Sequence, residues 1–175
     1  MAEPAFTSFP VLTSERLILR QLIPQDDAAL FSLRADDEVN RYIGRLKQTD
    51  IKEARTFIQE ARQGDWLYWA ICTKESNSPI GTICLWNFSE DTTSAELGYE
   101  LMPKFQGHGY MSEAVKAVLD YGFSTLGLQS LYAYTHIENK PSRRVLEKNN
   151  FNYLPDVKDV GGVDHVAFRL PAPVH

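Results

Sequence analysis

Three strand-like segments separated by short polar turns are the feature that most constrains how this chain can fold. The segments at residues 66–74, 80–88 and 95–102 are largely apolar, and the stretches 76–79 and 89–93 between them read SNSP and SEDTT. Turn-forming residues of this kind join neighbouring strands directly. A parallel return would need a crossover of a dozen or more residues, so we expect an antiparallel meander here.

Helical and strand-like patterns alternate on both sides of this meander. The segment 49–64 has apolar residues at helical spacing, with Thr49 or Asp50 as a cap and Gly64 as a stop. The other expected elements are strands at 16–23, 128–137, 151–157 and 163–170, helices at 25–35, between Gly109 and Gly127, and at 140–150, an irregular segment at 37–44, and a turn at Gly161–Gly162.

Together these elements predict an α/β fold built on one mixed, mostly antiparallel sheet of about six to seven strands, flanked by about four helices. The chain has 175 residues, and a chain of this length buries roughly 70% of the surface that its unfolded form exposes. No linker or internal repeat interrupts the pattern. We therefore expect one domain over residues 1–175.

Composition and charge set aside several classes of protein. The apolar content of 43% and charged content of 23% are those of an ordinary globular protein, and a net charge of −5 does not suggest a partner that is a nucleic acid. We see no secretory signal and no apolar run of about 20 residues, so we expect a cytoplasmic protein without a membrane partner. Cys72 and Cys84 lie in apolar runs and are expected to be buried; no metal-binding spacing is present.

The junction between the third strand and the next helix, PKFQGHGYMSEA at residues 103–114, is rich in glycine. A helix start leaves backbone N–H groups without partners and carries the positive end of the helix dipole. Glycine removes the Cβ that would hold a phosphate away from these amides. Two interpretations stay open here: a tight turn that needs positive φ, and a cradle for an anion.

Three kinds of nucleotide cradle compete for this junction. A Walker A loop is excluded, because no Lys-Ser or Lys-Thr follows at the right spacing. GHGYMS gives only G-x-G-x-x-S of the Rossmann fingerprint, although Glu138 follows the next strand where a ribose-binding acid could lie. The antiparallel meander and the short remaining chain argue against that fold. The third interpretation is a coenzyme A cradle.

KFQGHG at residues 104–109 resembles the pyrophosphate-binding signature of GCN5-related N-acetyltransferases (the GNAT superfamily), R/Q-x-x-G-x-G/A, with Lys104 in place of Arg or Gln. The resemblance extends to SERLILRQLIPQDDAALFSL, AELGYELMPKFQGHGYMSEAVKAVLDYGF and ENKPSRRVLEKNNF, which look in order and spacing like the RimJ/RimL-type branch. Three ordered segments spread over roughly residues 13–170 are far more specific than a lone motif.

This resemblance implies acetyl-CoA as co-substrate and a set of residues that would bind it. Leu101 and Met102 would offer main-chain groups to the pantetheine arm, and Asn139 matches an asparagine that contacts it. The basic start of the 140–148 helix, with Arg144, would add positive charge, although a solvated face explains it equally well. The phosphates would meet the main-chain amides of Gln106, Gly107, His108, Gly109, Tyr110 and Met111, with Lys104 adding charge.

The same resemblance implies catalytic roles for Glu96, Ser142 and Asn139. Glu96 matches an acidic position on the third strand and could take the amine proton, directly or through water; an exposed strand carboxylate is the plainer alternative. Ser142 matches the serine near the thioester sulfur and could protonate the thiolate, or simply cap a helix. Asn139 equally suits a turn before a helix. We expect His108 to be exposed and not catalytic. We expect His136 to have a structural role.

The acceptor is the least constrained part of this prediction. In the family it lies between the first helices and the sheet, here roughly Arg34 to Lys47 and Trp66 to Trp69. Relatives of the RimJ/RimL type suggest a protein N-terminal amine attacking directly in a ternary complex. A small amine such as a polyamine, amino acid or antibiotic is the alternative acceptor. A non-catalytic acetyl-CoA-binding module is the alternative function. The chain could also form a homodimer.

Overall fold

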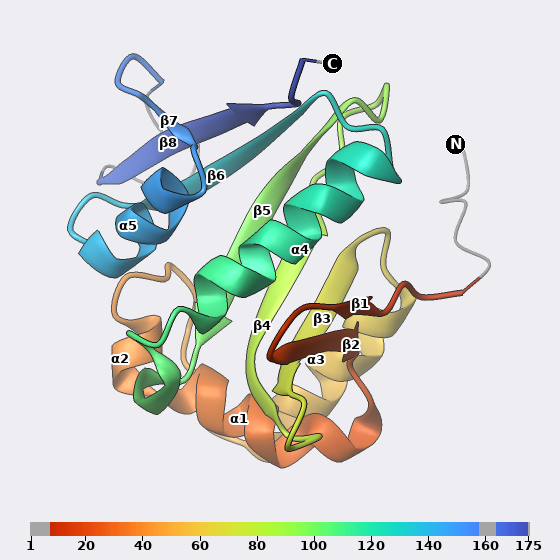
Figure 1. The fold of residues 1–175 in the computed structure, drawn as a ribbon. Coiled ribbons are helices and arrows are strands. Elements are labelled where there is room, and N and C mark those ends of the chain that lie inside the picture. Colours follow the sequence, from red (N-terminus) through yellow and green to blue (C-terminus); the bar gives the residue numbers. More distant parts are fainter. Residues whose placement is uncertain (1–7, 158–163, 175) are drawn as a thin grey trace.

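A computed structural model describes residues 8–157 and 164–174 of the chain. These residues form one sheet of eight strands in the order β1-β2-β3-β4-β5-β6-β8-β7, with five α-helices packed around it (Figure 1). The predicted α/β class with one mixed sheet is confirmed. The strands are β1 Leu12–Thr13, β2 Leu17–Gln21, β3 Leu67–Thr73, β4 Pro79–Trp86, β5 Ser94–Leu101, β6 Ser130–His136, β7 Asn152–Leu154 and β8 His165–Pro171.

The helices follow the predicted order with one addition. Two short 3-10 turns, Pro24–Asp26 and Pro103–Phe105, precede α1 and the glycine-rich junction. None of the helices in the described residues is long and apolar enough to cross a membrane. The helices are α1 Asp27–Ala35, α2 Asp37–Asn40, α3 Ile51–Gln63, α4 Tyr110–Ser124 and α5 Lys140–Lys148.

The element counts exceed the prediction by small pieces. The expected six to seven strands become eight because the two-residue β1 pairs with β2, and such a short strand has no alternation to detect. The segment 37–44, expected to be irregular, begins with the single turn α2, whose start is capped by the Asp36 side chain accepting from the Val39 amide. The turn expected at Gly161–Gly162 lies outside the described residues.

The capping of α3 follows the sequence prediction. Asp50 is the N-cap, and its side chain accepts a hydrogen bond from the Lys52 amide. Glu53 reaches back to the amides of Thr49 and Asp50, so these hydrogen bonds lower the pKa of its carboxyl. This reciprocal arrangement satisfies amides that the first helical turn leaves without partners.

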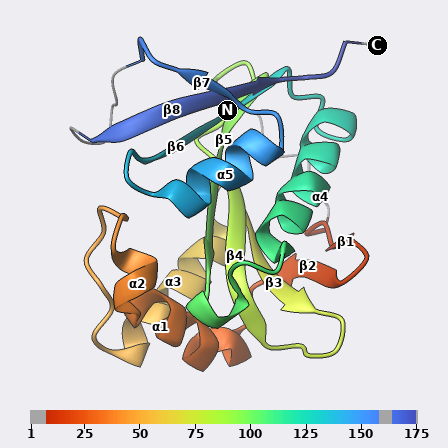
Figure 2. The ribbon, with the colours of Figure 1, turned by 60° about the vertical axis from the view of Figure 1, so that its left-hand side comes forward.

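Strands β3 to β5 form the predicted antiparallel meander, and β2 adds to it antiparallel to β3. In contrast, β5 and β6 run parallel and pair only briefly. Their ladder joins Ser94–Glu96 to Ser130–Tyr132, with α4 as the crossover, and then stops. Beyond this point the strands part, and Figure 2 shows β6, β7 and β8 running at a steep angle to β4 and β5. The sheet therefore opens a cleft in its own middle.

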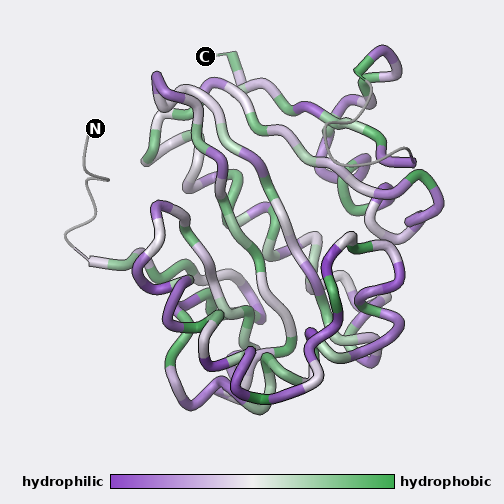
Figure 3. Tube along the Cα trace, turned by 180° about the vertical axis from the view of Figure 1, so that it is seen from behind, coloured by the Kyte–Doolittle hydropathy of each residue, from purple (hydrophilic) through white to green (hydrophobic). Residues whose placement is uncertain are grey.

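Two apolar clusters cover opposite faces of the sheet. Alternate residues of β3 divide between them: Trp69 and Ile71 pack with α4, whereas Ala70 and Cys72 pack with α1 and α3. Figure 3 shows apolar stretches running along the central strands between more hydrophilic loops. Cys72 and Cys84 are buried as predicted, and burial raises the pKa of their thiols to about 11 and about 12.

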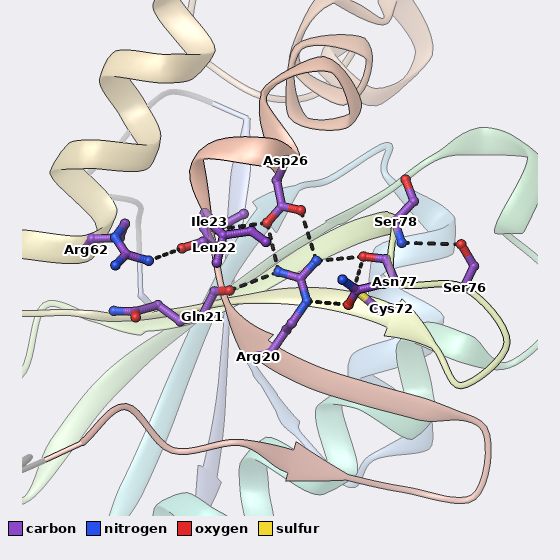
Figure 4. Close-up of polar contacts among 10 residues, drawn as sticks. All are labelled: Arg20, Gln21, Leu22, Ile23, Asp26, Arg62, Cys72, Ser76, Asn77 and Ser78. Carbon is purple, nitrogen blue, oxygen red and sulfur yellow. Dashed lines mark hydrogen bonds and ion pairs between the residues drawn. The ribbon is translucent and has the colours of Figure 1, made fainter.

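A buried ion pair joins the end of β2 to the start of α1 (Figure 4). Two nitrogens of Arg20 donate to the two carboxylate oxygens of Asp26 at 2.8 and 2.9 Å, and Asp26 also accepts from the Ile23 amide. The same guanidinium donates to the side chain and carbonyl of Asn77 in the β3–β4 turn. Asp26 is 3% exposed, so each of these partners replaces water that it has lost.

Replacing Asp26 with alanine should therefore lower the free energy of unfolding by about 3–5 kcal/mol, because it leaves the Arg20 charge buried without its partner. Urea denaturation of the purified variant measures this. The matched control is Arg55→Ala, which breaks the more exposed Arg55–Asp27 pair and should cost less than about 1 kcal/mol. Equal losses in the two variants would contradict the assignment of Arg20 and Asp26 as a buried anchor.

Candidate active site

The cleft between β5 and β6 has a volume of about 640 Å³ and reaches from the start of α4 to the loop after α2. Its walls come from elements that are far apart in the sequence. They are residues 38–39 and 41–44, the β5 residues 97–101, residues 105–107 and 109–112 at the start of α4, the β6 residues 133–135, His165, and Asn139, Pro141, Ser142, Arg144, Val145, Leu146 and Lys148 of the α5 region.

One end of the cleft is the glycine-rich junction. Gly107 and Gly109 have φ of 78° and 79°, a conformation that side chains with a Cβ rarely adopt. Gly109 is the N-cap of α4, so the first amides of this 15-residue helix face the junction. A Cβ built on Gly107 would meet no protein atom within 4 Å. The turn thus needs positive φ and leaves open space beside its amides, which fits a bound phosphate.

The predicted cradle residues divide between the cleft and its outer rim. Gln106, Gly107, Gly109, Tyr110 and Met111 line the cleft, and the side chain of Gln106 donates to the Leu101 carbonyl at 2.9 Å. The two other predicted residues of the cradle, Lys104 and His108, are exposed and do not line it.

The end of β5 presents main-chain groups to the cleft. The Met102 amide donates to the Ile80 carbonyl at 2.9 Å, and the Met102 carbonyl accepts from Phe105, so both groups of Met102 already have partners. Main-chain groups of a strand alternate between its two sides. The amides of Tyr99 and Leu101 therefore point away from β4, toward the open side. Of the two residues predicted to meet the coenzyme arm, Leu101 is the better placed.

Asn139 and Ser142 meet at the start of α5, on the wall opposite β5. Asn139 caps the helix, and its side-chain oxygen accepts from the Ser142 amide at 3.2 Å. The Ser142 hydroxyl lies 3.0 Å from the Tyr99 hydroxyl, which is also 3.0 Å from the Ser142 carbonyl oxygen. Burial raises the pKa of Tyr99 well above its usual range, so its hydroxyl stays protonated.

Tyr99 is a cleft residue that the sequence prediction missed. The alternation of β5 correctly places it on the face opposite Glu96, but nothing local indicates that this face meets α5. The signal available was its position between Gly98 and Glu100 on the strand that precedes the cradle. Arg144, predicted near the phosphates, lines the cleft from α5 and is exposed.

The two carboxylates of β5 have different surroundings. Glu96 lies where β5 and β6 are still paired, does not line the cleft, and accepts a hydrogen bond from Asn87 at 2.6 Å. Glu100 does line the cleft, but its oxygens are held by Arg34 at 3.2 Å and Arg45 at 2.5 Å. Glu100 is thus a charged anchor for the loop that carries Arg45.

The other end of the cleft is formed by the loop after α2, as the resemblance implied, but not by Trp66 to Trp69. Trp69 is fully buried in the core, and Trp66 donates to the Ala61 carbonyl beside α3. Tyr42 reaches across the cleft and stacks on His136 with ring centres 5.2 Å apart. His136 in turn accepts from the Glu138 amide, which fits the structural role expected for it.

Comparisons with known proteins show which family the chain belongs to. Residues 16–152 match the family described as Acetyltransferase (GNAT) domain. The chain belongs to the GNAT acetyltransferases. As a member of that family it is an enzyme that transfers acetyl groups, and the predicted superfamily is confirmed.

Individual GNAT relatives resemble the chain over most of its length. It is 36% identical over 149 residues to the uncharacterized N-acetyltransferase YoaA of Bacillus subtilis, covering 82% of this chain and 83% of that protein. A Bacillus anthracis acetyltransferase of the GNAT family superposes with a TM-score of 0.80 at 24% identity, over 93% and 98% of the two chains. A Vibrio cholerae spermidine N-acetyltransferase, solved with CoA and spermine, superposes with a TM-score of 0.79 at 19% identity, over 90% and 96%.

Gly107→Ala tests the phosphate cradle, with Gly127→Ala as a matched control. Both glycines have positive φ and open surroundings, so each substitution should cost about 1–2 kcal/mol of stability through backbone strain. Gly127 lies at the far end of α4. Only Gly107→Ala should raise the Kd for acetyl-CoA, by about tenfold, because its methyl group displaces an anion from charge-assisted hydrogen bonds worth about 1.5–3 kcal/mol. Isothermal titration calorimetry measures both affinities; equal Kd values for the two variants would contradict the cradle.

Proposed function

We propose that this chain transfers the acetyl group of acetyl-CoA to a primary amine by direct attack in a ternary complex. The observation that carries the proposal is the continuity of the cleft, which joins the amides at the start of α4 to the loop after α2. A coenzyme and an acceptor can therefore occupy one cavity together. The Vibrio cholerae relative was solved in complex with both CoA and spermine, which supports simultaneous binding of a coenzyme and an amine.

Binding of the coenzyme would use main-chain groups along one wall. The amides from Gln106 to Met111 would hold the diphosphate, helped by the positive end of the α4 dipole. Arg144 and Lys148, which line the cleft from α5, would add positive charge. The Leu101 amide, facing the open side of β5, would pair with the pantetheine arm as a neighbouring strand does.

Acetyl transfer then forms a C–N bond and breaks the C–S bond of the thioester. The amine attacks the carbonyl carbon, and negative charge develops on the carbonyl oxygen. An amide of β5 aimed into the cleft would stabilise this charge. Collapse of the intermediate expels the thiolate, which takes up a proton, while the amine nitrogen gives one up.

Ser142 is our candidate for protonating the departing sulfur. Asn139 fixes the start of α5, and Tyr99 holds the Ser142 hydroxyl from the opposite wall, 3.0 Å away. The single Tyr99 hydroxyl proton can go to the Ser142 carbonyl or to the Ser142 hydroxyl oxygen. When it goes to the hydroxyl oxygen, the serine proton would stay available to the sulfur. Serine is a weak acid, so the assistance is modest.

The amine proton would leave through Glu96 or through water. Because Glu96 lies outside the lining of the cleft, its carboxylate would act across a water molecule rather than by direct contact. Glu100 is nearer but is held by two arginines. An amine that enters in its neutral form needs no basic residue.

We propose a protein N-terminal amine as the acceptor, in line with the RimJ/RimL resemblance. Among the described residues that line the cleft, Glu38 and Glu100 are the only acids. Arg41 lies on the same wall as Glu38, and Arg34 and Arg45 outweigh Glu100. This balance is unfavourable for a polyamine with several positive charges.

An amine panel with acetyl-CoA tests both the reaction and the acceptor. The panel includes a peptide that has a free N-terminal amine and a first residue without a charged side chain. This peptide should support release of CoA thiol at a kcat/KM about tenfold above that of spermidine, because repulsion between the polyamine charges and the arginines near the cleft costs about 1.4 kcal/mol or more. The N-acetylated peptide is the control and should release none. Preference for spermidine would favour the small-amine alternative. Thermal stabilisation by acetyl-CoA without thiol release from any amine would favour a non-catalytic binding module.

Ser142→Ala should lower kcat by roughly tenfold while the Kd for acetyl-CoA changes less than about threefold, because a hydroxyl proton matters only as the sulfur gains charge. Tyr99→Phe should lower kcat in the same direction. The double variant should be no slower than Ser142→Ala, since both changes remove one interaction. Steady-state kinetics measures this, with the exposed Ser124→Ala as the control. Equal losses in kcat and affinity would show that Ser142 is structural.

A further inference from the structure

The guanidinium of Arg16 lies against the glycine-rich junction and does not line the cleft. One of its terminal nitrogens donates to the His108 carbonyl oxygen at 2.9 Å. The other lies 3.4 Å from the position that a Cβ on Gly109 would take. The guanidinium carbon is 4.4 Å from the centre of the Tyr110 ring. Arg16 thus contacts the peptide between the two positive-φ glycines.

Arg16 is itself fixed by a carboxylate in the first turn of α4. Its Nε lies 2.7 Å from one oxygen of Glu113, and its main-chain amide donates to the other at 2.7 Å. The Ser14 hydroxyl donates to the same carboxylate at 2.6 Å. Burial opposes ionisation of Glu113, but the hydrogen bonds from Ser14 and Arg16 outweigh it and lower its pKa. Glu113 is therefore ionised at neutral pH and anchors Arg16 from two directions.

The direction of the His108 carbonyl decides where the next amide points. The carbonyl of His108 and the N–H of Gly109 belong to one trans peptide plane and point in opposite directions. Because the carbonyl points to Arg16, the Gly109 N–H points away from Arg16, and Gly109 lines the cleft. Gly109, on one side of this peptide, has no Cβ and would otherwise let the peptide rotate more readily. A rotated peptide would present a carbonyl oxygen to an incoming phosphate.

Charge alone does not explain the placement of Arg16. Its positive charge is matched by Glu113 at 2.7 Å, so the pair has no net charge and produces a weak field at the distance of a ligand in the cleft. What the pair supplies is a fixed hydrogen-bond donor. The donor is held between the segment that precedes β2 and the first turn of α4, through two residues that are 97 positions apart in the sequence.

We propose that Arg16 is a positioning residue for coenzyme binding: it holds the His108–Gly109 peptide in the orientation that turns the Gly109 amide toward the cleft. The inference rests on the proposed binding of coenzyme phosphates at this junction. In this proposal, a side chain outside the cleft fixes the orientation of a main-chain amide that faces into the cleft. Loss of Arg16 reduces the fraction of molecules whose cradle is ready to bind, and the Kd rises by the inverse of that fraction.

The test measures acetyl-CoA binding by calorimetry and turnover by thiol release for Arg16→Ala and Arg16→Lys. If about one molecule in ten keeps the competent peptide, Arg16→Ala raises the Kd and KM for acetyl-CoA about tenfold, and kcat at saturating coenzyme stays within about twofold. Arg55→Ala, which breaks an ion pair of the same kind beside α1 and α3, is the control and leaves all three values unchanged. An Arg16→Ala protein that binds acetyl-CoA as tightly as the parent overturns the inference.

Two further readouts separate a fixed donor from a simple charge. The loss in Arg16→Ala is the same at low and high salt, and Arg16→Lys restores only part of the affinity, because a lysine cannot donate to His108 and Glu113 in the same geometry. A loss that vanishes at high salt, or full affinity in Arg16→Lys, would overturn the inference in favour of a charge effect. A parent protein that fails to bind acetyl-CoA would instead overturn the proposed function.

Discussion

The main-chain hydrogen bonds that β5 loses when β6 departs are the constraint on which the rest of the site depends. Buried peptide groups need partners, and the strand continues past Glu96 with amides that face no neighbouring strand. The protein meets part of this need itself, through the Gln106 side chain on the Leu101 carbonyl. The remaining groups are available to a ligand that runs alongside as a strand would. These groups suit the proposed coenzyme, because the pantetheine arm of coenzyme A has peptide-like groups.

Ion pairs between segments that are distant in the sequence hold the walls of this cleft in place. Arg45 ties the loop after α2 to Glu100 on β5, and Arg16, just before β2, is tied to the first turn of α4. Away from the cleft, Arg20 links the end of β2 to the start of α1 and to Asn77 in the β3–β4 turn. Glu100 and Asp26 are buried. Buried pairs contribute little net stability, but they set orientation, because removing one partner leaves an uncompensated charge.

The sequence was most informative where a local pattern determines local structure. The periodicity of α3, its Asp50 cap, the meander, and the two glycines with positive φ all follow from side chains within a few positions of one another. The motif order of the GNAT family added the expectation that the glycine-rich junction and Ser142 share one site, and both line the cleft. The prediction was less successful where the pattern was short, as in β1 and α2.

Long-range contacts were not predictable from the sequence. The meeting of Tyr99 with Ser142 depends on where β5 and β6 part, and no residue of either strand encodes the end of a parallel ladder. The meeting of Arg16 with His108 depends on how the segment before β2 packs against the start of α4. The same holds for Glu100, which reads as an ordinary strand carboxylate until the two arginines are placed beside it. The residues Trp66 to Trp69, expected near the acceptor, do not line the cleft, and β3 turns Trp69 into the core.

The pairing of two guanidinium groups with the single carboxylate of Glu100 has a consequence for the chemistry of the acceptor end. This cluster of three side chains has one more positive than negative charge. In the proposed reaction, such a cluster would disfavour an ammonium ion relative to the uncharged amine, and so would lower the proton affinity of a bound acceptor. Part of the deprotonation that the nucleophile requires would then be completed on entry, with the proton left to bulk solvent.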